Sequence, residues 1–84
     1  MNRDDVLAAV NSEREYQIRI GAKKKTVGEE ILLCEEYLSD CRNRWIKVTS
    51  TVGDGSYNDM MSNFRRMAAN LVRCMEEHGA GDIK

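Results

Sequence analysis

Two stretches of the chain place mostly apolar residues at alternating steps of four and three, and this spacing constrains the fold more than any other feature. The first stretch has Val27, Ile31, Cys34, Leu38, Cys41, Trp45 and Val48, and the second has Tyr57, Met61, Phe64, Ala68, Leu71, Met75 and His78. Such steps keep residues on one face of an α-helix, whereas a strand needs steps of two. The sequence therefore predicts amphipathic helices over 27–47 and 56–78, joined as an antiparallel hairpin.

A further helix is expected near the N-terminus, over residues 4–20. Asn2 or Asp4 can cap its first turn, and Gly21 follows its end, where glycine commonly terminates a helix. We expect this helix to lie across the hairpin. No stretch predicts a strand convincingly, so the expected fold class is all-α, with three helices.

The small size of the chain limits the core that it can build alone. Its 84 residues form one domain, 1–84. A chain of this length buries only about 60–65% of the surface that its unfolded form exposes. The apolar face of the 56–78 helix is too wide for one partner helix, so we expect a homo-oligomeric helical bundle. The predicted interface residues are Trp45, Met60, Met61, Phe64, Met67 and Leu71.

Charge and cysteine content exclude several classes of protein. With 13 Lys and Arg against 14 Asp and Glu, the formal net charge is −1, which argues against broad binding to nucleic acid. No apolar run approaches the ~20 residues that span a membrane, and the N-terminus lacks the pattern of an export signal. The three cysteines are an odd number and argue against a disulfide framework. We expect a cytoplasmic protein with reduced cysteines.

A basic cluster precedes the second predicted helix. Residues 23–25 are all lysine, and they stand directly before Thr26 and Glu29, which have the spacing of a capping box. A helix N-terminus beside lysines is a natural site for an anion, and tyrosine and arginine side chains could hold a nucleobase and its phosphate. A solvated loop with ordinary ion pairs is the alternative. The ligand-binding residues predicted are Tyr16, Arg19, Lys23, Lys24, Lys25, Thr26 and Arg73.

The acidic residues of the second predicted helix are weaker candidates for a site. Glu36 and Asp40 are four residues apart and could share Mg²⁺ on one helix face. The facing helix offers Arg65 and Arg66 where further carboxylates would be needed, so a solvated acidic face is the alternative. We expect no catalytic residue and no metal site, and no cofactor other than Mg²⁺ under an enzymatic interpretation.

Residues 13–17 (Glu-Arg-Glu-Tyr-Gln), 26–29 (Thr-Val-Gly-Glu) and 68–80 resemble segments of small phage and prophage proteins related to the MazG-like nucleotide pyrophosphohydrolases. The enzymes of that family hold Mg²⁺ with E-x-x-E on one helix and E-x-x-D on the next. These motifs would fall at Glu36, Ser39, Asn63 and Arg66. Glu36 alone keeps a carboxylate, so the resemblance implies the helical scaffold without the full metal site.

The size and three-helix layout are also similar to small helical phage sponge proteins that sequester cyclic nucleotide signals of bacterial immunity. The sequence thus predicts a non-enzymatic homo-oligomer that binds or sequesters an anionic nucleotide-like ligand between subunits, as an anti-defence sponge does. Two alternatives remain: a protein-directed inhibitor or adaptor that acts through the apolar helical face, and a Mg²⁺-dependent nucleotide pyrophosphohydrolase. The expected partners are further copies of the chain and a small anion, with no membrane.

Overall fold

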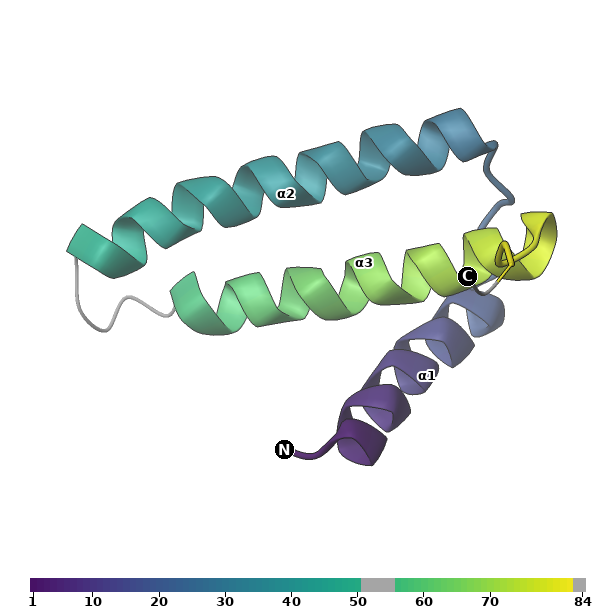
Figure 1. The fold of residues 1–84 in the computed structure, drawn as a ribbon, viewed down its shortest axis with the longest axis horizontal. Helices are drawn as coiled ribbons and strands as arrows, with labels where there is room; N and C mark the ends of the chain where they lie inside the picture. The colour runs from purple at the N-terminus through teal and green to yellow at the C-terminus, as the bar shows by residue number, and fades with distance from the viewer. Residues whose placement is uncertain (51–55, 83–84) are drawn as a thin grey trace.

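The computed structural model describes residues 1–50 and 56–82 and contains three α-helices in them (Figure 1). Helix α1 spans Arg3–Arg19, α2 spans Val27–Ser50 and α3 spans Ser56–His78. The predicted all-α class and the three helices are confirmed, and α2 runs three residues further than the predicted end at residue 47. Residues 51–55, where the sequence predicts the turn of the hairpin, lie outside the described residues.

The helix ends form where the capping residues predict them. Asn2 caps α1, because its Oδ1 accepts a hydrogen bond from the backbone N–H of Asp5 at 2.8 Å. Gly21 follows α1 with a φ of 66°, a left-handed conformation that glycine adopts without the penalty of a Cβ. Thr26 and Glu29 form the predicted capping box, with reciprocal bonds of 2.9 and 3.1 Å between backbone N–H groups and side-chain oxygens.

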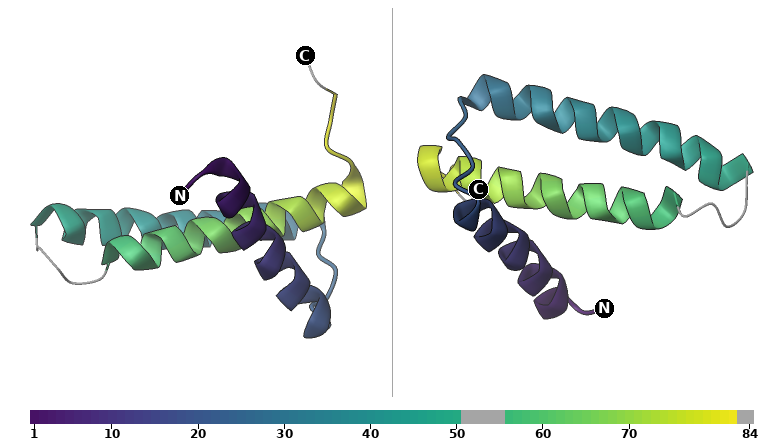
Figure 2. Two further views of the ribbon diagram at one scale, coloured as in Figure 1. Left: turned by 90° about the horizontal axis from the view of Figure 1, so that it is seen from below. Right: turned by 180° about the vertical axis from the view of Figure 1, so that it is seen from behind.

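Helix α3 is the central element, and both other helices pack against it. Helices α2 and α3 run antiparallel, while α1 crosses α3 obliquely (Figures 1 and 2). The predicted hairpin with an N-terminal helix across it is therefore confirmed. The radius of gyration is 14.4 Å, compared with about 12 Å for a compact chain of this length. The single chain is thus an open arrangement of helices.

The side chains between α2 and α3 are largely polar, and this differs from the sequence expectation. Among the described residues, the buried apolar side chains are those of Cys41, Met60 and Ala69. Most of the apolar positions with the four-three spacing are exposed instead: Val27, Ile31, Leu38, Trp45, Tyr57, Met61, Phe64, Leu71 and Met75. The side chain of Val48 lies outside the described residues. Because polar side chains occupy the facing sides of the two helices, the apolar residues are turned outwards.

Three polar contacts join α2 to α3 at successive levels. Arg73 donates to Glu30 at 2.5 Å, Asn63 donates to Asp40 at 2.6 Å, and Arg44 donates to Asp59 at 2.8 Å. Within α2, Arg44 also donates to Asp40 at 2.7 Å. These contacts fix the register of the two antiparallel helices, because each one pairs a given level of α2 with a given level of α3.

The most buried of these contacts, between Glu30 and Arg73, belongs to a hydrogen-bond network that includes all three helices. Glu30 of α2 and Arg73 of α3 are each 3% exposed. Arg73 also donates to Asn70 Oδ1 at 2.8 Å, and the same oxygen accepts a bond from Gln17 of α1 at 3.2 Å. The Asn70 amide in turn donates to the backbone carbonyl of Arg66 at 2.9 Å. Each helix thus has a polar side chain in one buried network.

Ion pairs complete the contact between α1 and α3. Arg14 donates two bonds to the Glu76 carboxylate, each of 3.0 Å, in the bidentate geometry that arginine favours. Arg65 donates to Glu13 at 3.0 Å. Glu13 and Arg14 of α1 therefore hold this helix on α3.

The buried network generates a prediction about stability. We expect Arg73→Met to lower the free energy of unfolding by about 3–5 kcal/mol, because it leaves the Glu30 carboxylate buried without its cation. The double variant Glu30→Leu/Arg73→Met should recover most of that loss, since no charge remains buried. Urea unfolding at one fixed protein concentration measures both effects. The control is Lys24→Met at an exposed position, and a loss no larger than the control's would contradict the role assigned to the pair.

Candidate functional site

The described residues contain a groove of about 340 Å³ where the C-terminal part of α1, the first turns of α2 and the middle of α3 meet. It lies beside the buried network. Its lining includes Tyr16, Gln17, Lys25, Tyr37, Arg66 and Arg73. Residues from all three helices and from the connection after α1 therefore contribute to one concave surface.

The groove carries an excess of positive charge. Its lining contains three cationic side chains, Lys25, Arg66 and Arg73, against one carboxylate, Glu13. That carboxylate is already paired with Arg65. Arg66 is exposed, and its guanidinium donates one long bond of 3.4 Å to Asn63. Lys25 and Arg66 are the cations placed to meet an anion from solution, because Arg73 is bonded to Glu30.

Two residues that line the groove each have a buried polar atom that lacks a protein partner. Gln17 is 9% exposed and uses its amide N–H on Asn70, while its Oε1 has no hydrogen-bond partner. Arg73 Nε is also buried without a partner. Unsatisfied buried polar atoms are uncommon in folded proteins because each costs about 1–3 kcal/mol. Gln17 thus has an unused carbonyl acceptor and Arg73 an unused N–H donor.

Two tyrosine rings lie at the same groove. Tyr16 comes from α1 and Tyr37 from α2, and both side chains line it. The guanidinium carbon of Arg19 lies 6.0 Å from the centre of the Tyr16 ring, at the limit of a cation–π contact. Flat rings beside cations can stack on a planar aromatic ligand while the cations bind its anionic groups.

The structure brings together some of the predicted ligand-binding residues. Tyr16, Lys25 and Arg73 line the groove, and Arg19 is stacked on Tyr16 beside it. All of these residues belong to one chain, whereas the sequence predicted a site between subunits. Arg73 differs from its predicted role, because its bond to Glu30 makes it part of the buried network.

The other predicted ligand-binding residues lie elsewhere. Lys23 and Lys24 are exposed, and they are not in the lining of the groove. Thr26 and Glu29 satisfy each other in the capping box. The hydrogen bonds from Thr26, first from its backbone N–H, lower the pKa of Glu29 below 4.5. The Glu29 carboxylate therefore already supplies negative charge at the start of α2.

Gln17, Tyr37 and Arg66 are not in the predicted set of ligand-binding residues. Tyr37 and Arg66 are nevertheless among the tyrosine and arginine side chains that could hold a base or a phosphate. The spacing of Arg66 and Arg73 could have indicated this site, because residues seven apart share one face of a helix. What the sequence could not show was that the ends of α1 and α2 would meet that face.

The acidic residues are not gathered into a metal site in the part of the chain that the structure describes. No group of three or more His, Cys, Asp or Glu side chains there could hold a metal ion. Glu36 is exposed, and Asn63 donates to Asp40. The hydrogen bonds from Arg44 and Asn63 lower the pKa of Asp40 below 3.8. Asp40 therefore belongs to the contacts that join α2 to α3.

The three cysteines are free, as the sequence predicts. Cys41 is buried and its thiol donates to the backbone carbonyl of Met60 at 3.9 Å. Cys34 and Cys74 are half-buried beside one another in a shallow groove between α2 and α3. Burial, together with the nearby Glu30 carboxylate, raises the pKa of Cys34, which disfavours the reactive thiolate.

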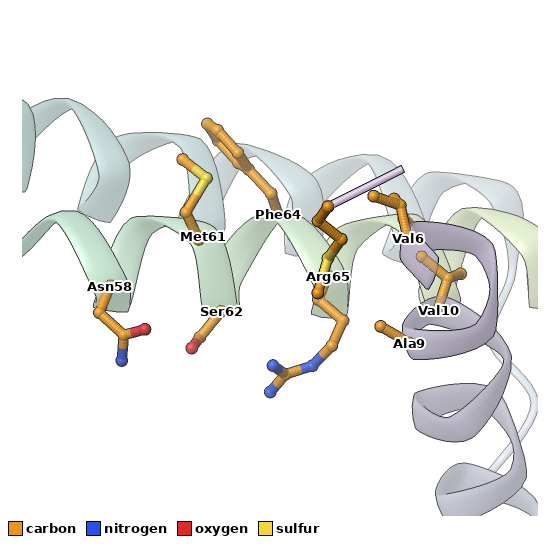
Figure 3. Close-up of a pocket in the computed structure, with 10 residues that line it drawn as sticks. Val6, Ala9, Val10, Asn58, Met61, Ser62, Phe64 and Arg65 are labelled. Carbon is orange, nitrogen blue, oxygen red and sulfur yellow. The ribbon is translucent and has the colours of Figure 1, made fainter. Parts of the chain in front are cut away.

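A second surface of the chain is apolar. A groove of about 490 Å³ lies between α1 and α3, where Met61 and Phe64 point to one side of α3 and Val6 and Val10 of α1 form a wall (Figure 3). On the other flank of α3, Leu71 shares a shallow apolar groove with residues of α2. We call the exposed apolar residues of the four-three stripes on α2 and α3, taken together, the apolar face. Its exposed members are Val27, Ile31, Leu38, Trp45, Met61, Phe64, Leu71 and Met75.

Four of the predicted interface residues, Trp45, Met61, Phe64 and Leu71, lie on the apolar face. Met60 does not, because it is 3% exposed and packs inside the chain's own core. Met67 is half-buried. Met60 is therefore not exposed to a partner, and the exposed residues Val27, Ile31 and Leu38 of α2 are not in the predicted interface set.

Within residues 1–50 and 56–82, none of the helices is both long enough and apolar enough to cross a membrane.

Comparison with protein-family models, curated proteins and solved structures finds no match to this chain.

The position of Asp40 gives a prediction about acid stability. A carboxyl group whose pKa is lowered on folding stabilises the folded state above its unfolded pKa, and this contribution is lost as the pH falls through the folded value. We expect Asp40→Asn to lower the melting temperature at neutral pH. The difference from wild type should shrink as the pH falls below 3.8. Thermal melts across this range test it, with Glu36→Gln as a control on the same helix. A difference that stays constant with pH would contradict the assignment.

Proposed function

We propose that the chain is a non-enzymatic binding protein that sequesters a small anionic, nucleotide-like ligand in the groove between α1, α2 and α3. The observation that carries this proposal is that one concavity is lined by two tyrosines, by two cations available to solvent and by Gln17, whose buried amide oxygen has no partner. Each of these features has a counterpart in a nucleotide, which has a planar base, anionic phosphates and base-edge donors.

The proposed binding mode assigns one part of the ligand to each group. Lys25 and Arg66 bind the phosphate, since a lysine acts as a mobile point charge and an arginine can bind two oxygens at once. Tyr16 and Tyr37 stack on the base, a contact worth about 1–3 kcal/mol per base. Gln17 Oε1 accepts a hydrogen bond from the ligand. This mode needs no metal ion and no nucleophile.

Sequestration is the form of this function that we propose. A protein that sequesters a ligand removes only as many molecules as it has binding sites. A short, simply folded chain suits this role because it supplies many sites for little protein. The likeness in size and helical layout to phage sponge proteins, which sequester cyclic nucleotide signals, supports the same interpretation. We also propose that the chain works as a homo-oligomer, since its exposed apolar face leaves a single copy with little core.

Ligand binding can be tested by calorimetry and thermal shift with AMP, ATP and cyclic di-AMP as probes. Adenosine and inorganic pyrophosphate serve as half-ligands, and both should bind more weakly than an intact nucleotide if base and phosphate are each recognised. A probe present at 100 times its Kd stabilises the fold by about 2.7 kcal/mol, which raises the melting temperature of a domain of this size by roughly 10–20 °C. Absence of any heat or shift across the panel would overturn the proposal.

Matched variants locate the site. Lys25→Ala and Tyr37→Leu should each weaken probe binding by roughly tenfold, whereas Lys23→Ala should have little effect because Lys23 is outside the groove. An equal effect of Lys23→Ala and Lys25→Ala would place the site elsewhere. Pyrophosphate release in the same samples with Mg²⁺ would instead favour the enzymatic alternative.

A further inference from the structure

We propose that the apolar face binds a second copy of this chain in a two-fold symmetric dimer, in which α2 pairs antiparallel with α2 and α3 pairs antiparallel with α3. The N-terminal turns of α1 border this face on the α3 side (Figure 3). The proposal does not rest on the proposed ligand, because it uses a different surface of the molecule.

The surface area of the single chain points to a partner of this size. Its accessible surface is 6484 Å², whereas a compact protein of the same mass exposes about 5,100 Å². The excess is about 1,400 Å². Obligate dimers bury roughly 1,000–2,500 Å² per subunit. The excess surface area of this chain is therefore of the size that one subunit of an obligate dimer buries. A second copy bound to the apolar face would cover it.

The exposed stripe on α3 is symmetric about its own middle. Met61 and Leu71 lie five residues before and after Arg66, and Phe64 and Ala68 lie two residues before and after it. When two such helices pair antiparallel about this level, Met61 meets Leu71 of the second copy, and Phe64 meets the small Ala68. A large side chain opposite a small one allows close packing of the two helices.

The stripe on α2 has its own middle at Leu38, with Ile31 and Trp45 each seven residues away. Pairing α2 with α2 about Leu38 therefore brings Ile31 opposite Trp45 of the second copy. One two-fold axis can serve both helix pairs only if the two midpoints lie at the same level of the hairpin.

The contacts within one chain satisfy that condition. Asn63 donates to Asp40, which sets those two residues at one level. Leu38 is two residues before Asp40, and Arg65 is two residues after Asn63 on the antiparallel helix, so Leu38 lies level with Arg65. The middle of the α3 stripe is the next residue, a difference of about 1.5 Å along the axis. A single two-fold axis therefore fits both stripes.

The charges at the rim agree with the same register. Glu35 and Arg42 are exposed and lie with Leu38 along one side of α2. They are three residues before and four residues after Leu38, so antiparallel pairing sets Glu35 beside Arg42 of the second copy. The symmetry repeats this pair, which gives two opposite-charge contacts and no like-charge contact between these positions.

The ligand groove stays open in this dimer. Arg66 and Arg73 are each two residues beyond Phe64 and Leu71, which is roughly 200° around the helix. The groove that they line therefore lies on the side of α3 away from the second copy. Loss of the dimer and loss of ligand binding can thus be measured separately.

Sedimentation equilibrium and light scattering of the full chain test the proposal. We expect a mass twice the 9.6 kDa of one chain. Leu38→Arg should raise the dimer Kd by roughly a hundredfold or more, because it sets two like charges at the symmetry axis. Leu32→Arg is the matched control, since Leu32 is exposed on α2 but its side chain points about 120° away from that of Leu38 around the helix. Circular dichroism checks that both variants remain helical.

A charge exchange tests the register without touching an apolar residue. Glu35→Arg and Arg42→Glu should each raise the dimer Kd by roughly tenfold, and the double variant should return close to wild type. The proposal is overturned by a wild-type chain that is monomeric at high micromolar concentration, or by a trimer or open assembly. It is also overturned if Leu32→Arg weakens the dimer as much as Leu38→Arg, or if the double exchange does not recover. A monomer that becomes soluble with an unrelated protein would indicate an adaptor instead.

Discussion

The arrangement of the three helices depends on the buried ion pair between Glu30 and Arg73. The pair neutralises two charges that are removed from water. Arg73 also donates to Asn70, whereas Glu30 Oε2 and Arg73 Nε have no hydrogen-bond partner. Asn70 and Gln17 extend the pair to α1, so the same network that sets α2 against α3 also sets the first helix. A shift of any one helix would separate buried polar groups and leave them without partners.

This polar interior has a consequence for the exterior. Ion pairs and side-chain amide hydrogen bonds make much of the contact between α2 and α3, and most of the apolar four-three positions of both helices are exposed. The hydrophobic effect then favours covering that surface rather than tightening the single chain. Within the chain, the directional polar contacts fix the register of the helices, whereas covering the exposed apolar residues would contribute free energy in proportion to the area buried.

The helices themselves were predictable from local chemistry. The three helices, the cap at Asn2 and the capping box of Thr26 and Glu29 follow from residue spacing and side-chain type, and the largest error in a helix end is three residues, at the end of α2. The groove was predictable in part. Lys25 and Tyr16 were selected because cations and rings suit a nucleotide-like anion. Tyr37 and Arg66 were left out of the predicted set because nothing along the chain distinguishes them from the other tyrosine and arginine residues.

The sequence by itself determined three helices and the presence of wide apolar stripes, because both depend on the spacing of residues within a single segment. The tertiary structure decided which sides of α2 and α3 meet. Glu30 and Arg73 are far apart along the chain, and no periodicity reveals that they will pair. In the arrangement that this pair stabilises, the apolar stripes lie on the outside of the chain. The C-terminal part of α1 and the first turns of α2 lie beside Arg66 and Arg73 of α3, where they form the groove.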